Sequence, residues 1–151
     1  MTQFSRFIRL VLIISIPLWN LNCTGSAMNE KQAQKVLNDF YTENVPEEVI
    51  GHQLWETGER IVPYVLVEIQ KKEMPRRGYA ILSLGKIGDR RALAVLTRIL
   101  EDMDEPNHIR ADALRAIWHI DGKCGEELAS KHAGKNNHID RTIELLRGGK
   151  I

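Results

Sequence analysis

Apolar residues recur at helical spacing through most of the chain after residue 28. In residues 76–100, RRGYAILSLGKIGDRRALAVLTRIL, they fall on both sides of a Gly-Asp pair. This pattern predicts two antiparallel helices that meet along one seam. A helical pair this short cannot bury its own apolar face, so we expect it to pack against further units of the same kind.

Three segments before this pair are also predicted to be helical. Residues 30–44 place four apolar side chains on one helical face. Residues 46–57 are expected to form a helix that has Pro46 at its first position and is stopped by Gly58. In residues 59–72 the β-branched side chains also allow a strand, but a proline in the first turn and an apolar stripe favour a helix.

The chain repeats its own pattern with a period slightly over 30 residues. An offset of 31 places Val62, Val65 and Ile69 on Leu93, Leu96 and Leu100, and an offset of 33 places Arg77, Ala80, Ile81, Leu84 and Ile87 on Arg110, Ala113, Leu114, Ile117 and Ile120. A weaker third unit follows in residues 126–149, where Ile139, Ile143 and Leu146 keep one helical face.

These repeats, with the acidic turn EDMDEPNHIR between two helices, resemble the HEAT-repeat family, particularly the short form also found in phycobilisome-lyase-like proteins. The resemblance covers residues 59–121 well. It implies an all-α fold, a short right-handed α-solenoid of about three helical hairpins plus N-terminal helices. In that family an acid in the turn and a basic residue six positions later form a polar ladder between units. Asp104 and Arg110 have this spacing, whereas Lys71 and Arg77 occupy it in the preceding unit.

The first 27 residues have the layout of an export signal: a basic start, an apolar run from Leu10 to Trp19, then small polar residues. Cleavage before Met28 gives a soluble product, whereas Cys23 resembles the lipidated cysteine of bacterial lipoproteins. A retained membrane anchor and a buried N-terminal helix are further interpretations. We expect an exported protein, periplasmic or attached to the membrane of the cell envelope, that meets the membrane only through this anchor or through a lipid on Cys23.

The chain therefore divides into three predicted parts. Residues 1–27 are the signal or anchor, residues 28–45 a polar linker with the N-terminal helix, and residues 46–151 the repeat domain. The first part contains Arg6 and Arg9 and no acid, so its removal changes the net charge from +1 to −1, with 19 basic against 20 acidic residues. A near-neutral protein lacks the positive field of a dedicated nucleic-acid binder, and we expect no nucleic-acid partner.

The sequence contains no recognisable arrangement for catalysis, phosphate binding or zinc binding. The histidines fit no zinc spacing, and we expect neither a metal nor a cofactor; they are His52, His108, His119, His132 and His138. If Cys23 is lipidated or removed, Cys124 is a lone packing residue. If both persist in an oxidising compartment, a disulfide between Cys23 and Cys124 is the alternative. We therefore predict a protein that is not an enzyme.

The predicted binding surface lies on the second helix of each hairpin, which lines the concave side in HEAT-type stacks. With Ala80, Leu84 and Ile87 facing inward, a helical wheel turns the opposite sides of the two second helices outward. The candidate residues there are Tyr79, Leu82, Ser83, Lys86, Asp112, Arg115 and His119. This mixture of aromatic, apolar and charged side chains suits a protein interface.

The function predicted from these features is a non-catalytic protein-binding scaffold or adaptor of the bacterial cell envelope, whose protein partner the sequence does not identify. Two alternatives stay open. Similarity to the lyase-associated repeats implies a chromophore-handling protein that acts on a bilin. A purely structural, membrane-tethered spacer needs no discrete partner.

Overall fold

The computed structural model describes residues 28–42, 44–46 and 49–151, and within them the chain is all-helical, without a strand. The predicted export signal in residues 1–27, and with it every interpretation of Cys23, lies outside the described residues. None of the helices in the described part of the chain combines the length and the apolar character that a membrane crossing requires.

Helices and short 3₁₀ turns follow one another along the described chain. The α-helices are α1 (Glu30–Thr42), α2 (His52–Thr57), α3 (Val62–Glu68), α4 (Arg77–Ile87), α5 (Leu93–Glu101), α6 (Asn107–Ile120), α7 (Gly122–His132) and α8 (Asn137–Arg147). The 3₁₀ helices η2 (Gly58–Arg60) and η3 (Arg90–Ala92) precede α3 and α5 respectively. These two turns therefore occupy corresponding places in successive units, in line with the period of the sequence.

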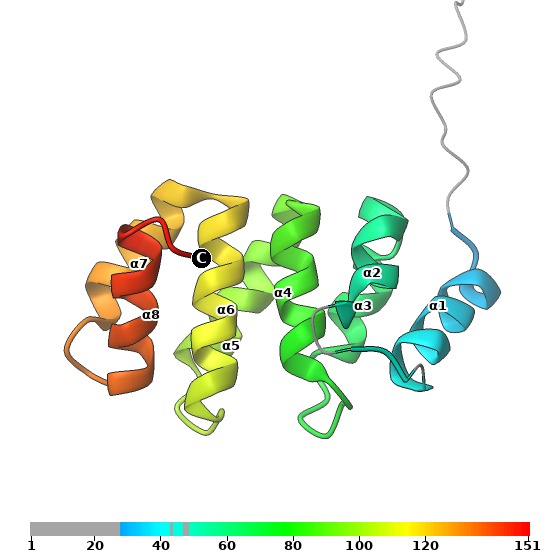
Figure 1. The fold of residues 1–151 in the computed structure, drawn as a ribbon, viewed down its shortest axis with the longest axis horizontal. Coiled ribbons are helices and arrows are strands. Elements are labelled where there is room, and N and C mark those ends of the chain that lie inside the picture. The colour runs from blue at the N-terminus through cyan, green and yellow to red at the C-terminus, as the bar shows by residue number, and fades with distance from the viewer. Residues whose placement is uncertain (1–27, 43, 47–48) are drawn as a thin grey trace, which may run out of the picture.

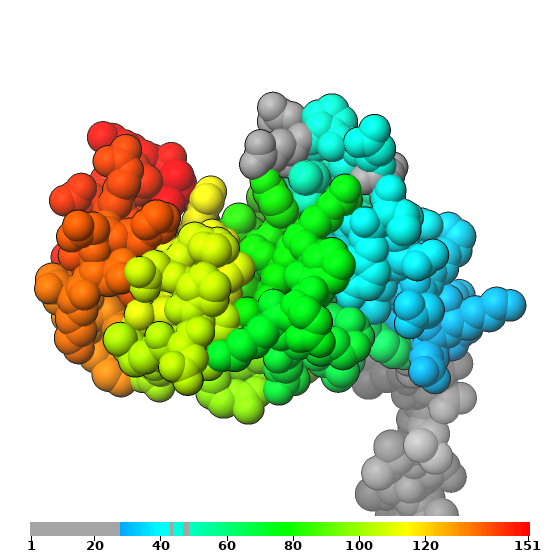
Figure 2. Space-filling model, turned by 90° about the horizontal axis from the view of Figure 1, so that it is seen from below, coloured from blue at the N-terminus to red at the C-terminus, as the bar shows by residue number. Residues whose placement is uncertain are grey.

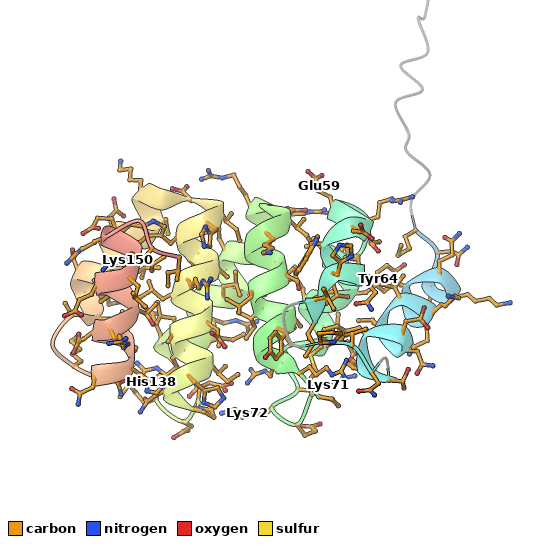
Figure 3. All side chains as sticks on the ribbon, viewed as in Figure 1. Glu59, Tyr64, Lys71, Lys72, His138 and Lys150 are labelled. Atoms are coloured by element: carbon orange, nitrogen blue, oxygen red, sulfur yellow. The ribbon has the colours of Figure 1, made fainter. Side chains whose placement is uncertain are left out.

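The helices lie in two rows (Figure 1). Helices α2, α4, α6 and α8 stand side by side in the front row, and each contacts the next. Helices α3, α5 and α7 stand behind them, and α6 also packs against α5 and α7. Turns lie at both edges of the molecule, with Lys72 and His138 near one edge and Glu59 at the opposite one (Figure 3).

The predicted helices are confirmed, including the helical assignment of residues 59–72, but the second one was placed wrongly. It begins at His52, not at Pro46, because Gly51 has the left-handed φ of 92° and interrupts the helix. A Cβ on Gly51 would lie 2.5 Å from the hydroxyl oxygen of Ser83 on α4, so only glycine fits this contact. The end of the helix before Gly58 agrees with the prediction.

One continuous core runs through the units, and corresponding positions are buried to the same degree. Most positions of α4 and α6 that are related by the offset of 33 residues are buried in both helices. They are Arg77, Ala80, Ile81 and Leu84 in α4 and their counterparts Arg110, Ala113, Leu114 and Ile117 in α6. The last pair, Ile87 and Ile120, is half-buried in both helices. Ile139, Ile143 and Leu146 of α8 are buried as well, so the weaker third unit belongs to the same core.

The two buried arginines make the same hydrogen bond in successive units. The Nε of Arg77 donates to the carbonyl oxygen of Ile69 at 2.6 Å, and the Nε of Arg110 donates to that of Leu100 at 2.8 Å. Both carbonyls lie at the C-terminal ends of first helices, where backbone acceptors lack helical partners. The repeat in the sequence is therefore also a repeat of one specific contact.

Glycines allow neighbouring helices to approach closely at two contacts. A Cβ on Gly85 of α4 would lie 2.8 Å from the Cα of Ala116 on α6. A Cβ on Gly125 of α7 would lie 2.6 Å from the Cα of Trp118 on α6. Since real Cβ atoms do not come this close to backbone, the separation of these helices depends on glycine at both positions.

Helix α1 is tied to the rest of the molecule by its core and by two tyrosines. Phe40 is buried in the common core. The hydroxyl of Tyr41 donates to the carboxylate of Glu68 at 3.0 Å, and the hydroxyl of Tyr64, labelled in Figure 3, donates to the carbonyl of Met28 at 2.9 Å. These bonds fix the point where the described chain begins against helix α3.

Candidate functional site

A groove crosses the exposed side of the front row. Its larger part, about 730 Å³, lies between α4, α6 and the turns that precede them, and its smaller part, about 150 Å³, lies between α2, α4 and α6. Tyr79 and Leu82 line both parts, so the two form one continuous surface, here called the α4/α6 groove. Seen from below, α8 and the segment that contains α2 (residues 49–57, here called the α2 region) lie on either side of α4 and α6, and this side of the molecule is hollowed (Figure 2).

Six of the seven predicted binding residues line this groove. Tyr79, Leu82, Lys86, Arg115 and His119 surround the smaller part, and Asp112 lies in the larger part. Ser83 was placed wrongly, because its side chain is only 1% exposed. Its hydroxyl donates to the carbonyl of Tyr79 at 2.8 Å and lies 3.3 Å from the carbonyl of Gly51, whose segment covers this part of α4.

The smaller part of the groove has a wall that the sequence analysis missed. Ile50 and Trp55 from the α2 region face α4 and α6 there. The ammonium nitrogen of Lys86 lies 4.0 Å from the centre of the Trp55 ring, a cation–π contact, and the ring of His52 packs edge-on against the same tryptophan. A tryptophan in a short helix without a clear apolar stripe was the signal that could have indicated this wall.

The floor of the larger part contains a buried ion pair between two units. The guanidinium of Arg77 binds both carboxylate oxygens of Glu105, at 2.6 and 2.7 Å, and both side chains are at most 5% exposed. The predicted ladder pair of Asp104 and Arg110 is wrong: Asp104 is exposed, and the Nε of Arg110 donates to the backbone carbonyl of Leu100. The acid is one residue later, because Glu105 turns inward against Arg77 of the preceding unit.

Asp112 is a half-buried acid in the groove that has neither a hydrogen bond nor an ion pair with any described residue. Burial raises its pKa to about 6, although the charges of His108, Arg115 and His138 act in the opposite direction. Its carboxylate approaches the backbone of α4 at Gly78, where a Cβ would lie 2.6 Å from Oδ2. A carboxylate that is desolvated without a partner destabilises the fold, and such groups gather at functional sites.

Replacing Asp112 by asparagine is expected to stabilise the protein at neutral pH. Its ordinary pKa of 3.8 rises to about 6 on folding, so above pH 6 the ionised form costs the folded state up to about 3 kcal/mol. Below pH 6 the folded state keeps a proton that the unfolded state loses, and the penalty disappears towards pH 4. Urea unfolding of wild type and Asp112→Asn between pH 4 and 8 should show a gap that grows with pH; a gap independent of pH would contradict this account.

Other titratable groups of the described chain, in the groove and on α7, also have shifted pKa values. Partial desolvation, with the charges of Arg115 and Lys86, lowers the pKa of His119, so its ring is mainly neutral at pH 7. In the described part of the chain, no three His, Cys, Asp or Glu side chains gather in a way that could hold a metal ion. Cys124 is half-buried on α7, and burial raises the pKa of its thiol.

No family model, curated protein or solved structure matches this chain. The groove is therefore interpreted from its own chemistry. It offers apolar and aromatic walls together with acidic and basic side chains, and these are the components of a surface for non-covalent recognition.

Proposed function

We propose that this chain is a short HEAT-like α-solenoid that acts as a non-catalytic protein-binding scaffold of the bacterial cell envelope. The observation that carries the proposal is the α4/α6 groove, because helices of successive units build it and it contains Asp112 without a partner. A molecule that only needs to fold gains nothing from a desolvated acid at its surface, whereas a binding site uses it for recognition.

Corresponding contacts in successive units support the solenoid arrangement. Arg77 and Arg110 bind equivalent carbonyls, the same helical positions are buried in α4 and α6, and the front-row helices lie side by side. In stacks of this kind each unit buries its apolar face only against its neighbours, and the extended surface of one helical row is free for contact.

The composition of the groove supports a protein as the partner. Tyr79, Leu82 and Ile109 give it apolar area, and Lys86, Arg115 and Asp112 add charges of both signs. Protein interfaces combine aromatic and apolar anchors with a polar rim in this way, whereas a nucleic-acid site needs a strong excess of basic residues. Placement in the cell envelope is supported by the signal-like pattern of residues 1–27.

The proposed function predicts that a change in the groove abolishes partner binding, while a matched change on the other row does not. Leu82→Asn removes apolar contact area from both parts of the groove. Val67→Asn makes the same kind of change on α3 at a side chain that is 58% exposed. After cross-linking in native cells and purification, we expect wild type and Val67→Asn to recover the same partner and Leu82→Asn to recover at least about fivefold less.

Circular dichroism and thermal unfolding of the three proteins provide the control for folding. Equal recovery by Leu82→Asn and Val67→Asn would place the binding surface elsewhere. Absence of a discrete partner for the wild-type protein would favour the structural spacer instead.

A further inference from the structure

The smaller part of the α4/α6 groove contains two cations, Lys86 and Arg115, that are not bonded to any carboxylate of the described chain. Neither Lys86 nor Arg115 forms an ion pair or a hydrogen bond with another described residue, and Lys86 only contacts the face of Trp55. Burial lowers the pKa of His119, and the charges of Arg115 and Lys86 add to this lowering. The two positive charges therefore converge on one small hollow, which has a volume of about 150 Å³.

Other cations along the groove are bound by the protein itself. Arg77 is held by both oxygens of Glu105. Lys72 lies 3.0 Å from the carboxylate of Asp102 and 4.0 Å from that of Glu105. Arg76 donates to the carbonyl of Phe40 at 2.7 Å. Lys86 and Arg115 differ from these neighbours because no described carboxylate or carbonyl is bonded to them, although Arg115 also acts on Asp112 through its charge. Both can therefore bind a molecule in the hollow.

The walls of the hollow are apolar, so a ligand that fits it carries an apolar group as well as a negative charge. Ile50, Trp55, Tyr79 and Leu82 surround the space beside the two cations. A carboxylate that enters is partly shielded from water, and its attraction to a cation is stronger there than at an open surface. His119 is mainly neutral at pH 7 and offers a hydrogen bond without a further full charge.

Nucleic acids and anionic membranes fit this geometry less well than a single carboxylate does. Two cations are too few to bind a polyanion strongly, since affinity for nucleic acid grows with the number of neutralised phosphates. The adjacent part of the groove contains Asp112 and Asp104, whose charge repels a second phosphate.

We propose that this hollow recognises an aspartate or glutamate side chain of the partner protein, next to an apolar side chain that packs on Tyr79 and Leu82. The inference rests on the proposed function and adds the chemistry of the bound segment. Lys86 and Arg115 bind the carboxylate, and Asp112 in the adjoining part of the groove accepts a hydrogen bond from the same segment. Such complementary charges mainly determine which partner is chosen and in which register it binds.

This proposal can be tested with a library of random 12-residue peptides displayed on yeast. The bait is the full-length protein in mild detergent. We expect enriched peptides to carry Asp or Glu beside a large apolar residue. The double reversal Lys86→Glu with Arg115→Glu should weaken their binding at least about tenfold and should select basic peptides instead. Arg98→Glu with Arg141→Glu changes the net charge equally at exposed positions that do not line the groove and should leave binding unchanged.

The possible outcomes separate this inference from the proposed function. Peptides that depend on Leu82 but are not acidic, or that tolerate the double reversal, would overturn the inference and leave the binding groove intact. If both double variants lose peptide binding equally, the effect comes from net charge alone, and the inference is overturned as well. Binding of phosphatidylglycerol vesicles through Lys86 and Arg115 without enrichment of any peptide would contradict both proposals.

Discussion

Replacing Glu105 by alanine is expected to lower the free energy of unfolding by about 3–5 kcal/mol, because it leaves the buried guanidinium of Arg77 without its counter-ion. Arg77 keeps its bond to the carbonyl of Ile69, but that bond does not neutralise the charge. Glu105 also joins two units, so its loss should loosen the contact between α4 and the turn before α6. Urea denaturation at pH 7 measures the effect.

Asp104 provides the matched control for this prediction, since it is the neighbouring acid in the same turn. Its side chain is exposed and forms no ion pair with a described residue. Asp104→Ala should therefore change stability by no more than about 0.5 kcal/mol. Similar effects of the two substitutions would show that Glu105 is not the acid that joins the units.

Two glycines of α7 are expected to respond with opposite sign to the same substitution. In Gly125→Ala the new methyl group meets the Cα of Trp118 at 2.6 Å, and separating α6 from α7 should cost about 1–3 kcal/mol. The gain in helix propensity that alanine brings, about 1 kcal/mol, offsets part of this cost, so the net destabilisation should reach up to about 2 kcal/mol. In Gly122→Ala nothing lies within 4 Å of the new methyl group, so the propensity gain should appear as higher stability.

Because Gly122 and Gly125 lie in the same helix, comparing the two variants separates the effect of packing from that of helix propensity. The free energy of unfolding of each variant, obtained from urea denaturation at one pH, is sufficient for this comparison. Stabilisation by both substitutions would mean that α6 and α7 are farther apart than the 2.6 Å contact at Gly125 implies. Destabilisation by both would mean that the N-terminal turn of α7 needs glycine for another reason.

The repeating part of the fold could be predicted because its signal is periodic. Ile81, Leu84, Leu114 and Ile117 recur at helical spacing and at a fixed offset, and all four are buried. Burial of a residue by a distant segment leaves no such signal. Ser83 lies on the outward side of a helical wheel, yet the chain around Gly51 covers it.

Details of the turns were predicted less well than the helices. The spacing of six residues selected Asp104, but the path of the turn directs Glu105 to Arg77. The start of α2 was set by the unusual φ of Gly51 and not by Pro46. Turn geometry depends on single backbone angles, which hydrophobic periodicity does not encode.

The candidate groove was predicted only for the helices that carry the repeat. Tyr79, Lys86 and Arg115 could be grouped because α4 and α6 are related by one offset. Trp55 was missed, since α2 lies outside the clear repeat and its contact with Lys86 depends on how α2 packs on α4. The charge of Asp112 was visible in the sequence, whereas its lack of a partner depends on the whole surroundings.

The most direct test of the central claim is photo-cross-linking in native cells from one position in the groove and one outside it. A photoreactive amino acid at position 82 lies in the α4/α6 groove, and one at position 67 lies on α3 at an exposed site. We predict a discrete cross-linked protein from position 82 and none from position 67. The same cross-linked proteins from both positions, or a product from position 67 alone, would contradict the account.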